Sequence, residues 1–137
     1  MPGTVRPAAS PDPPAPTRKR ILIVEDEAPI SEMLSDHLAL LGYESLAAFD
    51  GATAIDIAWR EQPSLITLDL SLPDMNGYAV LRVLKTDEAT AHIPLIILSA
   101  YASSNLPEDL PGAVALVRKP FDLDKLTETI RISLGDA

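Results

Sequence analysis

Five short, mostly apolar runs alternate with segments of helical spacing along this 137-residue chain. The runs cover residues 21–24, 43–48, 64–68, 94–98 and 113–117. Runs with little alternation between apolar and polar positions are typical of strands that are buried on both faces of a parallel sheet. Because crossovers between parallel strands are right-handed, the alternation predicts an α/β fold, a doubly wound five-stranded parallel sheet with helices on both faces.

The segments between the runs carry helix signals. The apolar residues that indicate the four helices are Ile30, Met33, Leu34, Leu38 and Leu41; Ile55, Ala58 and Trp59; Val80, Leu81 and Leu84; and Leu126, Ile130 and Leu134. Pro29 and Gly42 are expected near the start and at the stop of the first helix. Asp50 and Asp122 are the expected N-caps of the second and the last.

Residues 1–19 differ in composition from the rest of the chain. Six of the 13 prolines lie there, and large apolar residues are almost absent. Such a stretch cannot bury enough surface to offset its ordering entropy, and no apolar core follows its charges as in a secretory signal. We expect a disordered proline-rich leader over residues 1–19 and one domain over residues 20–137.

Composition excludes several classes of function. The chain has no cysteine, which excludes disulfides, thiolate metal ligands and a cysteine nucleophile. The net charge is −9, although residues 1–20 hold four basic side chains against one acidic one, so the domain itself is strongly acidic. Phosphates of nucleic acid and of anionic lipids are bound by Lys and Arg, and no apolar run approaches ~18 residues. We therefore expect no direct contact with nucleic acid or membrane.

Polar side chains follow four of the five predicted strands. Glu25 and Asp26 follow the first, Asp69 the third, Ser99 the fourth, and Lys119 comes just after the fifth. The carboxyl ends of parallel strands meet at one edge of the sheet, so these groups should line one crevice. Neighbouring carboxylates repel unless a cation lies among them, and an oxygen-only ligand set favours Mg²⁺.

This set of groups suits phosphoryl transfer. A metal ion and an ammonium group would neutralise the phosphoryl oxygens while a carboxylate attacks in line. Asp69 is the expected nucleophile because it stands alone at the end of a central strand. The Glu25–Asp26 pair is better placed to hold metal.

Four motifs occur in order at these strand ends: residues 21–27 (ILIVEDE), 68–77 (LDLSLPDMNG), 98–100 (LSA) and 118–121 (RKPF). Together they resemble the response-regulator receiver domain of two-component signalling, over about residues 20–134. The resemblance implies the flavodoxin-like receiver fold and a phosphoryl group accepted from a histidine kinase. The implied phosphoryl-site residues are Asp69, Ser99 and Lys119. The implied Mg²⁺ ligands are Asp26, Asp69, the main-chain carbonyl of Ser71 and, through water, Glu25.

Two features depart from the family pattern. Three residues before Lys119 the family usually carries Tyr or Phe, and this chain carries Leu116. Residues 101–112, where the family has a helix, contain Pro107 and Pro111, so we expect one turn or an irregular loop there. We also expect a cis Lys119–Pro120 bond, as the resemblance implies.

Several other side chains are expected to have structural roles only. His37 and His92 have no acidic or histidine neighbour at ligand spacing, so they are predicted to be plain surface residues. Trp59 and Phe121 are predicted to pack. Glu27 fits the acidic residue that is common at the start of a helix.

We therefore predict a cytoplasmic receiver that accepts a phosphoryl group on Asp69 and acts as an interaction switch without its own output domain. It would be a phosphoacceptor and not an enzyme with a separate substrate. Its expected partner is a sensor histidine kinase or a histidine phosphotransfer protein. The chain itself is expected to be a monomer or a weak homodimer. The alternative is a phosphorylation-independent scaffold. A hydrolase of the haloacid dehalogenase type is disfavoured because the position two residues after the nucleophile is Ser71, not Asp.

Overall fold

The computed structural model describes residues 18–99, 113–119 and 122–136. Within them, five parallel strands are arranged in the order β2-β1-β3-β4-β5. The strands are β1 (Arg20–Val24), β2 (Glu44–Ala48), β3 (Leu65–Asp69), β4 (Leu95–Ser99) and β5 (Ala113–Arg118). The helices are α1 (Ala28–Leu40), α2 (Gly51–Glu61), α3 (Gly77–Thr86) and α4 (Leu123–Leu134). The predicted doubly wound sheet is confirmed, and its strand order is that of flavodoxin-like folds.

Several sequence predictions lie outside the described residues. They concern most of the leader, Ala100, the segment 101–112, Pro120 and Phe121. The predicted strands inside the described ranges agree with β1 to β5 to within one residue at each end.

The strand order places a crevice above β1 and β3. From β1 the chain crosses to β2 at one side, and it then returns to β3 on the other side. Connections that leave in opposite directions open a gap at the carboxyl ends of the two central strands, which is where ligands bind in open α/β sheets. The functional groups predicted from the strand ends therefore gather here.

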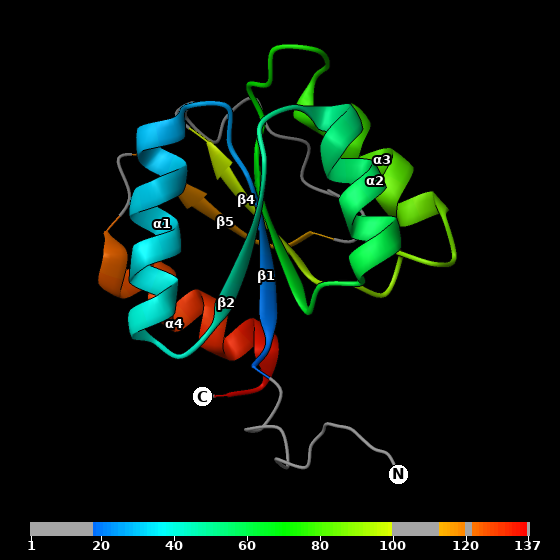
Figure 1. Ribbon diagram of the computed structural model, residues 1–137. Coiled ribbons are helices and arrows are strands. Elements are labelled where there is room, and N and C mark those ends of the chain that lie inside the picture. Colours follow the sequence, from blue (N-terminus) through cyan, green and yellow to red (C-terminus); the bar gives the residue numbers. More distant parts are fainter. Residues whose placement is uncertain (1–17, 100–112, 120–121, 137) are drawn as a thin grey trace, which may run out of the picture.

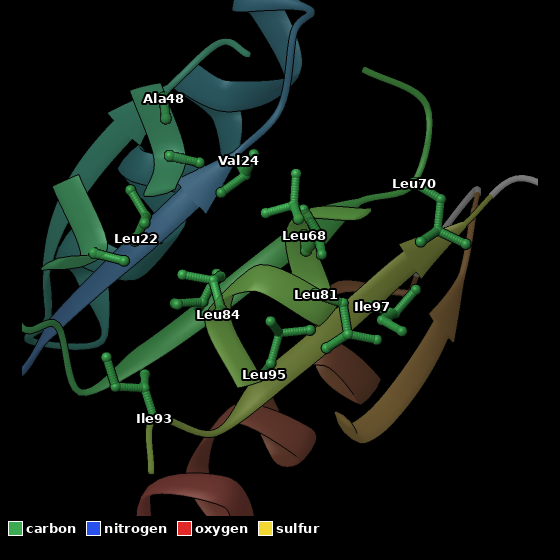
Figure 2. Close-up of a cluster of buried hydrophobic side chains, with 14 residues drawn as sticks. Leu22, Val24, Ala48, Leu68, Leu70, Leu81, Leu84, Ile93, Leu95 and Ile97 are labelled. Carbon is green, nitrogen blue, oxygen red and sulfur yellow. The ribbon is translucent and has the colours of Figure 1, made fainter. Parts of the chain in front are cut away.

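Each face of the sheet is covered by two helices, α1 and α4 on one face and α2 and α3 on the other (Figure 1). Successive strand side chains point to opposite faces, so β1 sends Leu22 and Val24 toward α2 and α3 and sends Ile21 and Ile23 toward α1 and α4. Figure 2 shows the first of these cores, in which Leu68, Leu95 and Ile97 of the sheet meet Leu81 and Leu84 of α3. Each fully buried aliphatic side chain contributes about 1.5–3 kcal/mol.

Local capping signals predicted two helix starts correctly. The Asp50 carboxylate accepts the Thr53 amide at 2.7 Å, and the Asp122 carboxylate accepts the Asp124 amide at 2.9 Å. Gly42, the predicted stop, follows the first helix with φ +93°, a left-handed conformation that glycine adopts without strain.

Two side chains correct the sequence analysis. Trp59 was predicted to pack, yet 58% of its surface is exposed, and 42% of Met33, an apolar residue at helical spacing in the first helix, is exposed as well. A surface helix buries only one stripe, and these two residues lie beside that stripe and not on it. His37 is half-buried and its Nε2 lies 2.6 Å from Thr127 Oγ1, which joins α1 to α4, whereas His92 is exposed as predicted.

A polar cluster ties the two ends of the described chain together, away from the crevice. Lys19 Nζ lies 2.6 Å from Asp136 Oδ1 and donates to the Leu134 carbonyl at 3.1 Å. The Tyr43 hydroxyl donates to the other Asp136 oxygen at 2.9 Å. These residues lie at the amino-terminal ends of β1 and β2 and at the end of α4 (Figure 1).

Among the described helices, none is long and apolar enough to cross a membrane.

The buried Thr67 hydroxyl gives a stability prediction. Thr67 lies inside β3, and its Oγ1 has no hydrogen-bond partner among the described residues. Because an unpaired buried hydroxyl is costly, Thr67→Val should raise the free energy of unfolding by about 1 kcal/mol in urea titration. Thr90→Val is the matched control, since the buried Thr90 hydroxyl donates to the Leu84 carbonyl at 2.7 Å. This control should lose about 1 kcal/mol, and equal effects of the two substitutions would contradict the prediction.

Candidate functional site

Two acidic side chains lie side by side at the carboxyl ends of the central strands. Val24 of β1 is in register with Leu68 of β3, so one further step brings Glu25 level with Asp69. The Glu25 amide continues the sheet by donating to the Ala48 carbonyl at 3.0 Å, which holds this residue in line with its strand. Glu25 is fully buried and Asp69 is 5% exposed. The site therefore begins with two carboxylates that are shielded from water.

Lys119 supplies the cation for both carboxylates. Its Nζ lies 2.8 Å from Glu25 Oε1 and 3.2 Å from Asp69 Oδ2, with 15% of the side chain exposed. The backbone fixes the approach, because the Lys119 amide donates to the Ser99 carbonyl at 2.7 Å. One ammonium group thus connects the ends of β1, β3 and β5.

Burial changes the proton affinity of this cluster. It raises the pKa of Glu25 from 4.5 to about 7; the hydrogen bond from Lys119 opposes this rise, and the neighbouring Asp69 charge adds to it. Burial alone would lower the pKa of Lys119. The hydrogen bond to Glu25 and the charges of Asp69 and Glu25 outweigh it, so the Lys119 pKa lies above its ordinary value. Lys119 therefore remains charged at neutral pH.

The segment after β3 bends back over Asp69. The Ser71 amide donates to Asp69 Oδ1 at 3.1 Å, and the Gly77 amide closes the turn on the Leu70 carbonyl at 2.9 Å. A Cβ atom on Gly77 would lie 2.5 Å from Leu70 Cα and 2.9 Å from the Asp69 carbonyl oxygen. Glycine is required at this position because only a residue without a side chain permits that approach. The Asp69 carboxylate is consequently held from both sides, by Ser71 and by Lys119.

Glu25 also belongs to a group of three consecutive acidic residues. Glu25, Asp26 and Glu27 each bring one carboxylate oxygen within 4.8 Å of the others, and Asp26 and Glu27 are exposed. Glu25 is already engaged, since its Oε1 meets Lys119 and its Oε2 accepts the Glu27 amide at 3.2 Å. The donors are all oxygens, and the carboxylates outnumber the single ammonium of the cluster. This donor set fits a hard divalent cation such as Mg²⁺.

The predicted site residues come together, with different degrees of contact. Side-chain contacts join Glu25, Asp69 and Lys119 directly. Ser71 touches Asp69 through its amide, and Ser99, which is buried at the end of β4, touches Lys119 through its carbonyl. Asp26 belongs to the acidic group around Glu25.

Comparison with known proteins agrees with this geometry. The family model for the response regulator receiver domain matches residues 21–131. The chain belongs to the response regulator receiver family. The receiver domain is similar to the polar-differentiation response regulator DivK of Brucella ovis, at 36% identity over 87% of this chain and 98% of that protein.

Solved receiver structures have the same fold. A CheY-like receiver domain protein from Methanospirillum hungatei has a TM-score of 0.80 at 28% identity, covering 88% of this chain and 96% of that one. The receiver domain of the sensor histidine kinase PA1611 from Pseudomonas aeruginosa has a TM-score of 0.77 at 27% identity, over 87% and 99% of the two chains, and holds a magnesium ion in its active site cleft. The predicted family and fold class are confirmed.

Sequence reasoning missed the contacts of two acidic residues, Glu27 and Asp74. Glu27 was assigned only to the start of a helix, yet its carboxylate joins the group with Glu25 and Asp26. Asp74 received no role, although its two oxygens accept the Gly51 and Ala52 amides. The acidic run at residues 25–27 was a visible signal for the first residue. The partners of Asp74 are 23 and 22 positions away, so no local pattern marked the second.

The buried Glu25 carboxyl gives a pH-dependent prediction. Between its ordinary pKa of 4.5 and its folded value of about 7, the folded state keeps a proton that the unfolded state has lost. The Glu25 contribution to stability therefore falls as pH rises through this window. In EDTA, the free energy of unfolding of Glu25→Gln, taken relative to that of the native chain, should rise by about 2 kcal/mol from about pH 5 to about pH 8.

Urea titration at the two pH values measures this gain. Glu32→Gln, at an exposed glutamate on α1, is the matched control and should shift stability equally at both. A flat difference for Glu25→Gln would show that the buried carboxyl does not carry the predicted cost.

Proposed function

We propose that Asp69 is the phosphoacceptor of this receiver domain and that its phosphorylation controls an interaction with another protein. The observation that supports this most strongly is the buried contact of one ammonium group, Lys119, with both Asp69 and Glu25. It places a fixed positive charge 3.2 Å from the proposed nucleophile. Such a charge stabilises the additional negative charge that a phosphoryl group brings.

The proposed reaction is a transfer between two residues. An Asp69 carboxylate oxygen attacks the phosphorus of a phosphohistidine, an O–P bond forms, and the N–P bond breaks with its electron pair returning to the imidazole. The Ser71 amide holds Asp69 Oδ1, which leaves the carboxylate one orientation for the attack. Lys119 pairs with the phosphoryl oxygens, and the Ser99 hydroxyl at the end of β4 hydrogen-bonds to them.

We propose that Mg²⁺ is held by Asp26, Asp69 and the main-chain carbonyl of Ser71, with Glu25 acting through water. When bound, it neutralises charge on the phosphoryl oxygens. The exposure of Asp26 supports a direct role, whereas both oxygens of the buried Glu25 are engaged by Lys119 and by the Glu27 amide. The proposed phosphodonor is a sensor histidine kinase or a histidine phosphotransfer protein.

Acetyl phosphate tests the assignment without a kinase. With Mg²⁺, intact mass should show one adduct of ~80 Da, and Asp69→Asn should abolish it because an amide cannot form the acyl phosphate. Asp56→Asn is the matched control, since Asp56 is an exposed α2 residue paired with Arg60 at 3.0 Å. It should label like the native chain.

Two results would oppose the proposal. Labelling of Asp69→Asn at the native level would move the acceptor elsewhere. No labelling of the native chain, with the fold intact by circular dichroism, would favour the phosphorylation-independent scaffold.

A further inference from the structure

The loop between Asp69 and α3 is fastened at its base. Ser71 and Asn76 face each other as an isolated antiparallel bridge, and the Gly77 amide donates to the Leu70 carbonyl at 2.9 Å. The Asn76 side chain then caps α3 by accepting the Tyr78 amide at 2.8 Å. Residues 72–75 lie between these paired positions and form the tip of the loop.

Asp74 fastens that tip to another element. Its Oδ1 accepts the Gly51 amide at 2.7 Å and its Oδ2 accepts the Ala52 amide at 3.0 Å, while Asp50 accepts the Thr53 amide. The first three amides of α2, which no helix can satisfy internally, are thus shared between one carboxylate of its own cap and one from the loop. The hydrogen bonds from the Gly51 and Ala52 amides lower the pKa of Asp74, so this carboxylate is charged at neutral pH. We call these two hydrogen bonds to Asp74 the clamp.

Apolar packing supports the same contact. A Cβ atom at Gly51 would lie 2.5 Å from Met75 Cγ and 2.9 Å from Val80 Cγ2. The absence of a side chain at the start of α2 therefore makes room for Met75, the neighbour of Asp74 in the loop. A polar and an apolar contact hold the tip on the same turn of helix.

We propose that Asp74 is a positioning residue for the chemistry at Asp69. The clamp holds the loop in one conformation, which keeps the Ser71 amide on Asp69 Oδ1 and directs the Ser71 carbonyl. This inference rests on the proposed function of Asp69. It assigns to α2 a part in shaping the site, although α2 contributes no side chain to the contacts among Glu25, Asp69 and Lys119.

Matched substitutions at the same helix terminus separate positioning from simple stability. Asp74→Ala removes the clamp, and Asp50→Ala removes the helix's own cap without touching the loop. Both should lower the melting temperature. Only Asp74→Ala should speed hydrogen exchange of the Ser71 amide, measured by NMR, and slow labelling by acetyl phosphate about tenfold, as loss of an outer-shell partner does. Asp74→Asn keeps one acceptor oxygen and should fall between Asp74→Ala and the native chain.

The two readouts distinguish the possible failures. If the Ser71 amide exchange rate and the labelling rate of Asp74→Ala equal those of Asp50→Ala, the positioning role is overturned and Asp74 is only a second cap of α2. If the native chain does not label at all, the phosphoacceptor assignment fails. The exchange of the Ser71 amide still decides whether Asp74 controls the loop, because it is measured without phosphodonor.

Discussion

One largely buried ammonium group between two buried carboxylates governs the geometry at the carboxyl ends of the strands. Lys119 follows β5, whereas Glu25 and Asp69 end β1 and β3, so its side chain reaches across the end of β4. Removing Lys119 would cost about 3–5 kcal/mol, because Glu25 and Asp69 would then stay buried without a compensating cation. The ends of the strands are therefore held in one arrangement, and the position of the Asp69 carboxylate follows from it.

The charge of the cluster also bears on the proposed phosphoryl chemistry. One ammonium group faces two carboxylates, and Asp26 and Glu27 add further negative charge on the exposed side. A phosphoryl group would add more, which is the electrostatic reason for proposing that Mg²⁺ is bound beside it. The fold brings these strand-end groups together, and the described acidic group of Glu25, Asp26 and Glu27 contains no histidine or cysteine.

The sequence predicted what depends on local pattern. Apolar runs marked β1 to β5, and Asp50 and Asp122 marked helix starts, because strands and caps depend on the residues next to them. The convergence of Glu25, Asp69 and Lys119 followed from the topology. The exposure of Trp59 and the clamp at Asp74 could not be predicted, because both depend on which distant element lies against the residue.

The cluster of Lys19, Tyr43 and Asp136 has a consequence for engineering. It holds residues that are 117 positions apart in the sequence within an ion pair, at the edge of the sheet opposite the crevice (Figure 1). A short peptide linker could join residue 136 to residue 18, which makes the domain a good subject for circular permutation. Fusion partners attached at residue 18 or residue 136 would lie at the end of the sheet opposite the crevice and leave the crevice open to another protein.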